Sequence, residues 1–447
     1  MKTIQTIKKF IFYFPLLLIV VMLLSCSKEK EIIIPQIKIA VTGYESLDNI
    51  SLPEGESIIL KAIVDNTTNY SVFWSVDGKE VSTDNDYNYE AQGIGEHQIV
   101  LKVVNHDSGE SQNSLNINVY GKYKHGTFIL NEGNMTTEQG SLIFISPNGE
   151  VTDSLYWRVN GSFLGNVTQD IFILDSKMYI ISQNGGGDGK LIIANAETLK
   201  KEIGYSDELS VLSWPTHIAV IEDNAYIRDN KGVYQFNLSS KELKYIEGSN
   251  GASKNRMAVI DGKVFVPAGK NIYVIKDGAI IHTIAMSGTI SGVIITDDKN
   301  IYVSCTTSPA QINKINASDY SIIKTNEITE AKVGAGWGAT PGISAKGDTI
   351  YFSNASTKIY RHIFSQNKTE YMTDVKEHIE NAGIVYNNLA VHPKTGEVYF
   401  NTIKAYGWDF LINDISVFNF SGPNPVLKAD YKNYTHFPAG IFFTDNF

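Results

Sequence analysis

Cysteine and proline are scarce in this 447-residue sequence, which contains only two cysteines, Cys26 and Cys305, and 12 prolines. If Cys26 carries a lipid, Cys305 has no cysteine partner and no intramolecular disulfide can form. Stability must then come from packing. The chain is long enough to bury the cores of more than one domain.

A positive charge balance is also lacking. The chain carries 48 acidic and 38 basic residues, a formal net charge of −10. Such a surface repels the phosphate backbone of nucleic acids. We therefore predict no nucleic-acid partner.

Catalytic and metal-binding signatures are missing as well. The sequence has no HExxH, GxSxG, P-loop or CxxC pattern, and its carboxylates are scattered through turns, where Asp serves backbone geometry. His217 and His436 are the histidines best placed to bind a metal, but two unrelated loops give no ligand spacing. The "GGGDG" stretch at 185–189 fits a flexible hairpin better than a calcium or phosphate site. The prediction is a protein that is not an enzyme, with no cofactor and no metal.

The sequence lacks an apolar run of membrane-spanning length. Lys2, Lys8 and Lys9 precede a 15-residue apolar run at 10–24, whereas a spanning helix needs about 20 residues. A positive segment followed by a short apolar run is typical of a cleaved secretory signal. We assign residues 1–25 to that signal.

The end of the signal resembles the bacterial lipobox, at Leu23-Leu24-Ser25-Cys26. That resemblance implies that Cys26 becomes a lipidated N-terminus; an ordinary signal with a chance cysteine is the alternative. The following "SKEKE" is similar to the charged tag of surface-exposed lipoproteins in Bacteroidetes-type bacteria. Residues 26–36 are therefore expected to be a lipidated surface tether, and the protein to be anchored in the outer membrane and exposed at the cell surface.

Residues 37–121 alternate apolar and polar positions, with turn signals between the segments. "SIILKAIVD", "YSVFWSVDGKEV" and "HQIVLKVVN" are spaced like strands of a small antiparallel sandwich, and Asp77-Gly78 is a turn dipeptide. This stretch is similar to PKD and immunoglobulin-like modules of surface proteins. The resemblance makes Trp74 the core tryptophan of the sandwich, and the module a spacer.

Residues 123–447 contain an internal repeat with a period of about 37 to 49 residues. Each unit reads strand, turn, strand with a central aromatic, loop, strand, turn, strand, which is typical of a β-propeller blade. The six units begin near Ile171, His217, Arg256, Gly292, Pro341 and Asn388. Their central aromatics, expected in the core between blades, are Tyr179, Tyr226, Phe265, Tyr302, Tyr351 and Tyr399.

A seventh blade can be assembled from the two ends of this region. "GTFILNEG", "SLIFIS" and "VTDSLYW" would supply three strands and the C-terminal "GIFFTDNF" the fourth. Joining the first and last strands removes an exposed sheet edge. The predicted fold is all-β, a seven-bladed β-propeller preceded by a small Ig/PKD-like β-sandwich, with six or eight blades as alternatives. The one plausible helical turn is "DVKEHIENAG" at 374–383.

One face of the predicted propeller gathers the candidate binding residues. Loops that lead into each blade, and loops that join its second and third strands, lie on the same face around the central channel and are common binding sites. Four tryptophans fall in such segments: Trp157, Trp214, Trp337 and Trp408. They suggest a ligand surface, although each loop could instead cover its own tryptophan.

Polar and aromatic partners occur in the same segments. They are Arg158, Asn160, Gln183, Asn184, Arg256, Tyr406, His436 and Phe437. An aromatic floor with amides and an arginine suits a large, flat ligand that carries amides or hydroxyls. For Arg256, which begins a strand, a salt bridge to a neighbouring blade is the alternative.

The segment from "ILNEGNMTTEQGSLIFISPNGEV" through "VNGSFLGNVTQDIFILDSKMYIISQNG" resembles a known family, the YncE-like seven-bladed propeller lipoproteins of Bacteroides-type bacteria. Matching features are Asn131-Glu132-Gly133-Asn134, Gly140-Ser141-Leu142, Asn160-Gly161, Leu164-Gly165, Gln169-Asp170 and Met178-Tyr179-Ile180. Some members capture cobalamin and cap a TonB-dependent outer-membrane barrel. The resemblance therefore implies capture of cobalamin or a related corrinoid and its transfer to such a transporter.

Two other functions stay open. Related propellers accompany polysaccharide-uptake systems, so a glycan-binding or adhesion protein is the main alternative. Some propellers are enzymes of lactonase or quinoprotein type, which would need a metal at the channel mouth. The N-terminal sandwich is not a feature that we associate with the simplest cobalamin-capturing members.

Overall fold

The computed structural model describes residues 32, 34–106, 109–334 and 340–444. The predicted signal peptide, lipidation at Cys26 and the Trp337 loop lie outside these residues. The chain divides into two compact units, Met1–Tyr120 and Gly121–Phe447. Each unit is described by itself.

The N-terminal unit consists of two β-sheets. One has the order β1 (Gln36–Val41), β3 (Ser57–Asp65), β6 (Asp86–Glu90). The other has the order β2 (Ile50–Pro53), β8 (Glu110–Tyr120), β7 (Gly95–Asn105), β4 (Tyr70–Val76), β5 (Lys79–Ser82). Both sheets contribute to one apolar core that contains the fully buried Trp74, whose indole Nε1 donates to Asp84 O at 2.9 Å. Trp74 thus has the core position expected for it.

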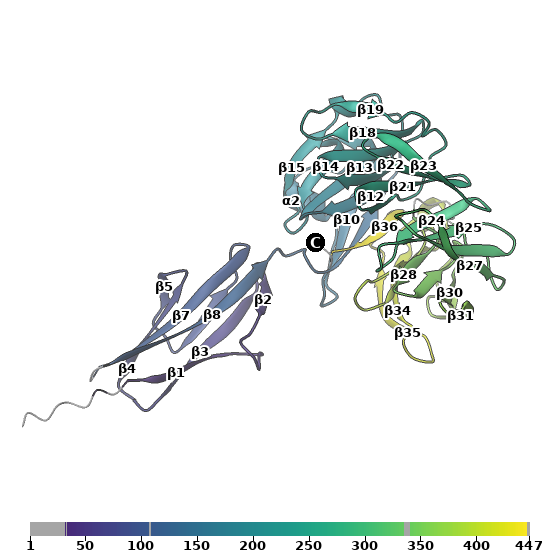
Figure 1. The fold of residues 1–447 in the computed structure, drawn as a ribbon. Helices are drawn as coiled ribbons and strands as arrows, with labels where there is room; N and C mark the ends of the chain where they lie inside the picture. Colours follow the sequence, from purple (N-terminus) through teal and green to yellow (C-terminus); the bar gives the residue numbers. More distant parts are fainter. Residues whose placement is uncertain (1–31, 33, 107–108, 335–339, 445–447) are drawn as a thin grey trace, which may run out of the picture. The chain divides into compact units, whose positions relative to one another are not determined.

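The second unit contains seven four-stranded antiparallel sheets, so the prediction of an all-β propeller is confirmed (Figure 1). The blades are numbered in chain order from β12, and the strands of each blade are given from the innermost outward. Blade 1 has β12 (Asn166–Leu174), β13 (Lys177–Gly186), β14 (Gly189–Asn195) and β15 (Lys201–Tyr205). Blade 2 has β16 (His217–Ile221), β17 (Asn224–Asp229), β18 (Gly232–Asn237) and β19 (Leu243–Tyr245). Blade 3 has β20 (Ala258–Ile260), β21 (Lys263–Ala268), β22 (Asn271–Lys276) and β23 (Ala279–Ala285).

The remaining blades follow the same order. Blade 4 has β24 (Ile290–Ile295), β25 (Ile301–Cys305), β26 (Ala310–Ile315) and β27 (Ile322–Ile328). Blade 5 has β28 (Ser344–Lys346), β29 (Thr349–Phe352), β30 (Lys358–Ile363) and β31 (Lys368–Asp374). Blade 6 has β32 (Ala390–Val391), β33 (Val398–Ile403), β34 (Asn413–Asn419) and β35 (Val426–Lys432). Blade 7 has β36 (Pro438–Phe443), β9 (Thr127–Asn131), β10 (Ser141–Ile145) and β11 (Val151–Thr152).

Blade 7 closes the ring with strands from both ends of the unit, as expected. The C-terminal strand β36 pairs antiparallel with β9, with Ile441 opposite Ile129 and Phe442 opposite Phe128. In Figure 1 the yellow β36 lies beside the blue strands that begin the propeller. This pairing gives β9 a partner strand on each side and makes β36 the innermost strand of its sheet.

The central aromatics of the repeat all lie on the second strand of their blades and are buried. Tyr179 packs in a cluster shared by blades 1 and 2, and Tyr226 in one shared by blades 2 and 3. A large ring at this position fills the space between neighbouring sheets, where close packing is required. The repeat therefore encodes the contacts between blades.

Hydrogen bonds join neighbouring blades at the end of the channel where the inner strands begin. We call this the channel-mouth end. In order around the ring the bonds are Thr168 N to Glu132 O, Ile218 N to Asp170 Oδ2, Arg228 Nε to Ala252 O, Asn255 Nδ2 to Ser291 O, Gly342 N to Ser291 O, Asn388 N to Thr340 Oγ1 and Asn387 Nδ2 to Pro438 O. Because these bonds connect every pair of neighbouring blades, loops at this end rest on a rigid support.

Helical structure in the described propeller is limited to short segments. They are α2 (Leu155–Asn160) and the 3-10 turns η1 (Asp207–Leu209), η2 (Val375–Glu377) and η3 (Gly407–Leu411). The expected helical turn at 374–383 is only η2, where the Asp374 side chain accepts a hydrogen bond from Lys376 N. The sequence does not indicate α2, because one amphipathic turn is too short to show helical periodicity. Among the described residues, no helix has the length and apolarity to cross a membrane.

Candidate functional site

Helix α2 connects the outer strand of blade 7 to the inner strand of blade 1 and presents Trp157. Its Leu155 and Tyr156 side chains are buried, and Tyr156 Oη donates to Asp188 Oδ2 at 2.9 Å. Ser162 and Lys201 contact the same Asp188 carboxylate. These contacts hold the helix on blade 1 and leave the Trp157 side chain about half exposed, at 48%.

The "GGGDG" stretch supplies this anchor. β13 extends to Gly186, which pairs with Gly189, so the stretch is a tight hairpin whose tip is Gly187-Asp188. Asp188 is part of the contacts that hold α2, which is a structural role. The strand also includes Gln183 and Asn184, which the sequence reading placed in a loop.

Two predicted ligand residues, Arg158 and Asn160, contact the scaffold around α2. The Arg158 guanidinium donates to the backbone oxygen and to the carboxylate of Asp153. Asn160 donates to Leu199 O at 2.9 Å and accepts from Lys201 N at 2.9 Å. Both ends of the Asn160 amide are therefore used to fix the helix in place.

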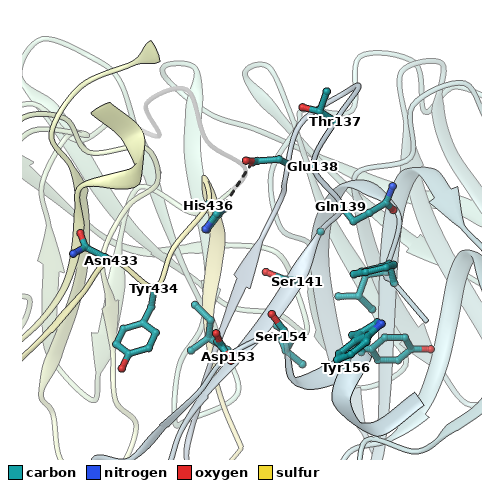
Figure 2. Close-up of a pocket in the computed structure, with 16 residues that line it drawn as sticks. Thr137, Glu138, Gln139, Ser141, Asp153, Ser154, Tyr156, Asn433, Tyr434 and His436 are labelled. Atoms are coloured by element: carbon teal, nitrogen blue, oxygen red, sulfur yellow. Dashed lines mark ion pairs between the residues drawn. The ribbon is translucent and has the colours of Figure 1, made fainter. Parts of the chain in front are cut away.

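A pocket of about 370 Å³ lies beside α2, between blade 7 and the end of blade 6 (Figure 2). We call it the seam pocket. Its walls include Trp157 and Phe163, whose rings stack with centroids 6.3 Å apart and planes 24° apart. Figure 2 shows Glu138 and His436 pointing toward each other, with Glu138 Oε2 3.5 Å from His436 Nδ1. The structure thus brings together two predicted residues, Trp157 and His436.

The other two described tryptophans of the propeller lie at the channel-mouth end and do not line the seam pocket. Trp214 precedes β16, and its backbone nitrogen donates to Asp229 Oδ2 at 2.7 Å. Trp408 lies in η3, after β33, with 86% of its surface exposed, and Tyr406 just before it is also exposed. Trp214 leads into blade 2, whereas Tyr406 and Trp408 follow the second strand of blade 6.

Arg256 lies inside the channel and forms an ion pair between blades. Its Nε is 3.1 Å from Asp170 Oδ1, and its guanidinium lies 4.1 Å from the centre of the Phe442 ring. Burial raises the pKa of Asp170 to about 6, and the neighbouring Arg256 charge limits the rise. The alternative expected for Arg256 was a salt bridge to a neighbouring blade. The ion pair is present, but it joins the start of blade 3 to blade 1, which is not its neighbour, and it occupies one side of the guanidinium. Below the mouth, Arg256 lines a cavity of about 240 Å³ whose walls are largely apolar.

The mouth also holds a polar group that the sequence reading did not select. Glu132 is buried, and its Oε2 accepts a hydrogen bond from Tyr386 Oη at 2.9 Å. Burial raises the pKa of Glu132, with Lys254 acting against the rise, and burial lowers the pKa of Lys254. Gln169 is also buried, and neither polar atom of its amide has a hydrogen-bond partner among the described residues.

Two further predicted residues border the mouth. Phe437 stacks on Phe410, with centroids 4.5 Å apart, and contacts Tyr386 at 5.4 Å. Gln183 is buried, and its Oε1 has no hydrogen-bond partner among the described residues, whereas Asn184 is exposed. Aromatic sequence signals could have indicated Phe163 in "RVNGSFLGN". Glu132 and Tyr386 are 254 residues apart, and only the closed ring brings them together.

No group of three or more His, Cys, Asp or Glu residues is placed to hold a metal ion in the part of the chain that the structure describes. Cys305 is buried on β25 as a free thiol. Burial raises the pKa of this thiol to about 11.

Comparisons with known proteins agree with this architecture. A family model described as "Domain of unknown function (DUF5074)" matches residues 125–444, which include all seven blades. A solved structure described as a quinonprotein alcohol dehydrogenase-like protein from Bacteroides thetaiotaomicron is 15% identical and covers 92% of this chain and 99% of that chain, with a TM-score of 0.53. BamB from Moraxella catarrhalis is 12% identical over 69% of this chain and 83% of its own, with a TM-score of 0.43. At 15% identity, the likeness to the Bacteroides thetaiotaomicron structure concerns the fold alone. A comparison with curated protein sequences found no match.

Proposed function

The chain belongs to the family described as "Domain of unknown function (DUF5074)", and from this premise we propose that it is a ligand-binding propeller. Its ligand is cobalamin or another corrinoid, captured at the channel-mouth end. The protein then passes the ligand to a TonB-dependent outer-membrane transporter. The support comes from the family resemblance of the sequence together with the side chains at this end.

The observation that carries the proposal is the set of exposed aromatic side chains around a polar mouth. Trp157, Trp214, Tyr406 and Trp408 each leave a large part of their surface open to solvent at the same end of the propeller. Burying one such side chain removes up to about 200 Å² from water and contributes a few kcal/mol. A broad ligand with apolar faces and an amide-bearing edge would cover these rings while its edge meets the polar mouth.

The proposed mechanism is capture without chemistry. Hydrogen bonds between all neighbouring blades make the binding end rigid, and a preorganised surface loses little conformational entropy when it binds. High affinity then requires the transporter to distort the site or compete for the ligand before release. We propose no enzymatic activity. The words "alcohol dehydrogenase-like" belong to the Bacteroides thetaiotaomicron protein and are not carried over to this chain.

Lipid attachment at Cys26 would keep the propeller at the outer surface, beside its transporter. Replacing Cys26 with Ala should move the protein from the membrane fraction to the soluble fraction of cells. Retention of the variant in the outer membrane would contradict the proposed anchor.

Titration with cyanocobalamin tests the proposed ligand. Binding at micromolar concentration should quench tryptophan fluorescence and leave a corrinoid absorption band on protein separated from free ligand. A Trp214→Ala, Trp408→Ala double variant should bind at least about tenfold more weakly, in line with the loss of contacts worth more than 1.4 kcal/mol. Tyr371→Ala, which removes an exposed ring from the outer strand of blade 5, is the matched control. Absence of a retained corrinoid band and of quenching would overturn the proposal.

A further inference from the structure

The seam pocket combines an apolar wall with a polar one. Trp157 and Phe163 form a nearly parallel pair, and each leaves about half of its surface exposed, 48% and 51%. Tyr156 and Asn160 fix the helix that carries Trp157, so this aromatic wall cannot easily turn inward. Covering the two rings with an apolar ligand face is therefore favourable.

Hydrogen-bond acceptors make up much of the polar side of the pocket. Glu138 leaves 30% of its side chain exposed, while its Oε2 is covered and lies 3.5 Å from His436 Nδ1. Arg158 contacts Oδ1 of the Asp153 carboxylate, and about half of the Asp153 side chain is exposed. Carboxylate oxygens in such positions suit a ligand that donates several hydrogen bonds.

The loop that carries Glu138 is held in shape by its own hydrogen bonds. Asn134 Oδ1 accepts from the backbone nitrogens of Thr136, Thr137 and Glu138 at 2.7 to 3.1 Å. Asn166 Nδ2 donates to Asn134 O and Glu138 O, both at 2.8 Å. The polar wall is thus formed before a ligand arrives, which lowers the entropic cost of binding.

The charges of the pocket disfavour an anionic ligand. Glu138 and Asp153 are the acidic side chains of the lining, and the nearby Arg158 and His436 already face them. A ligand carboxylate or phosphate would be repelled at short range. A neutral ligand rich in hydroxyl donors meets no such penalty.

We propose that the seam pocket binds a neutral hexopyranose. Such a sugar has a face of C–H groups, which would lie on the Trp157–Phe163 pair, and an edge of hydroxyls, which would donate to Glu138 and Asp153. The pocket volume of about 370 Å³ is at the lower end of the roughly 300–1,000 Å³ typical of ligand sites, which suits one or two sugar rings. This inference concerns a different ligand from the proposed corrinoid and does not depend on it.

Saturation-transfer NMR on the full chain provides the test. The probes are the methyl pyranosides of glucose, mannose and galactose, with methyl glucuronide as the anionic counterpart. At least one neutral pyranoside should receive saturation, strongest at the protons of one ring face, and should bind at least about fivefold more tightly than the glucuronide. No transfer to any of the three neutral sugars, or equal binding of the glucuronide, would overturn the inference.

Variants assign the signal to the seam pocket. Trp157→Ala and Phe163→Ala should each weaken binding about tenfold, and Glu138→Gln about fivefold, whereas Tyr371→Ala on blade 5 should leave binding unchanged. Circular dichroism checks that each variant is folded; Trp157→Phe, which keeps a ring, should retain part of the affinity. Unchanged sugar binding in folded Trp157→Ala and Phe163→Ala would refute the assignment.

Cyanocobalamin titration of the same samples separates the two proposals. Sugar binding without corrinoid binding would support this inference and overturn the proposed function. Corrinoid binding without sugar binding would do the reverse.

Discussion

Replacing Arg256 with Met tests the electrostatics of the channel. In the native protein, Arg256 Nε is 3.1 Å from Asp170 Oδ1, and the Asp170 side chain is only 3% exposed. The substitution would leave a buried carboxylate whose remaining partners are the backbone nitrogens of Ile218, at 3.3 Å, and Ile171. Removing one partner of a buried pair typically costs about 3–5 kcal/mol. We therefore expect Arg256→Met to lower the free energy of unfolding by about 3–5 kcal/mol at pH 8.

The pH dependence of the loss follows from the Asp170 pKa. Burial raises this pKa from 3.8 to about 6 in the native protein, a change that corresponds to about 3 kcal/mol. Because the folded pKa is raised, the stability contributed by Asp170 is fully present below about pH 4 and is lost as the pH rises through 6. Without Arg256 the pKa rises further. At pH 5 the carboxyl is then neutral, and the loss caused by Arg256→Met should shrink to about 1 kcal/mol.

Equilibrium urea unfolding at pH 5 and pH 8 measures the loss in the free energy of unfolding at each pH. The comparison holds if the dependence of that free energy on urea concentration is the same in both proteins. The matched control is the Asp170→Asn, Arg256→Met double variant, which buries no charge here and should recover most of the stability at pH 8. A loss of the same size at both pH values, or no recovery in the double variant, would refute the reasoning.

Three further predictions concern packing and reactivity. Phe265→Ala opens a cavity at a fully buried position between blades. It should lower the free energy of unfolding by about 3–5 kcal/mol in urea melts. A loss below about 1 kcal/mol would contradict the core role of the repeat aromatics. Trp408→Ala should change stability by no more than about 0.5 kcal/mol, since most of that side chain is in water, and a larger shift in the same melts would mean that η3 packs more tightly than described. Cys305 is buried, and its pKa is raised to about 11. It should therefore resist iodoacetamide at pH 8 in the native protein and react after unfolding, as measured by mass spectrometry. Rapid labelling of the native protein would contradict its burial.

Much of the fold could be predicted from local patterns. The spacing of aromatics such as Tyr179 and Tyr226 gave the blade period because each blade repeats the same packing requirement between sheets. The leftover strands at both ends indicated the β36–β9 closure, since an unpaired edge is unfavourable. Helix α2 escaped prediction because a single turn between strands carries too few residues for a periodic signal.

The candidate site was predictable only in part. The sequence placed Trp157, Trp214 and Trp408 at one end, because their loops occupy equivalent positions in the repeat. It could not show that Asn160 fixes α2, because its partners, Leu199 and Lys201, lie about 40 residues away.

The sequence by itself determined the number of strands per blade, the buried aromatics and the end of the propeller where exposed tryptophans gather, because these depend on local periodicity and on chain order. Only the tertiary structure decided which side chains meet there. Ring closure brings Glu132 to Tyr386, and Glu138 to His436, across some 250 to 300 residues. The seam pocket and the polar mouth exist because β36 pairs with β9. The leftover strands predicted that pairing, but the side-chain contacts that it creates depend on the folded ring.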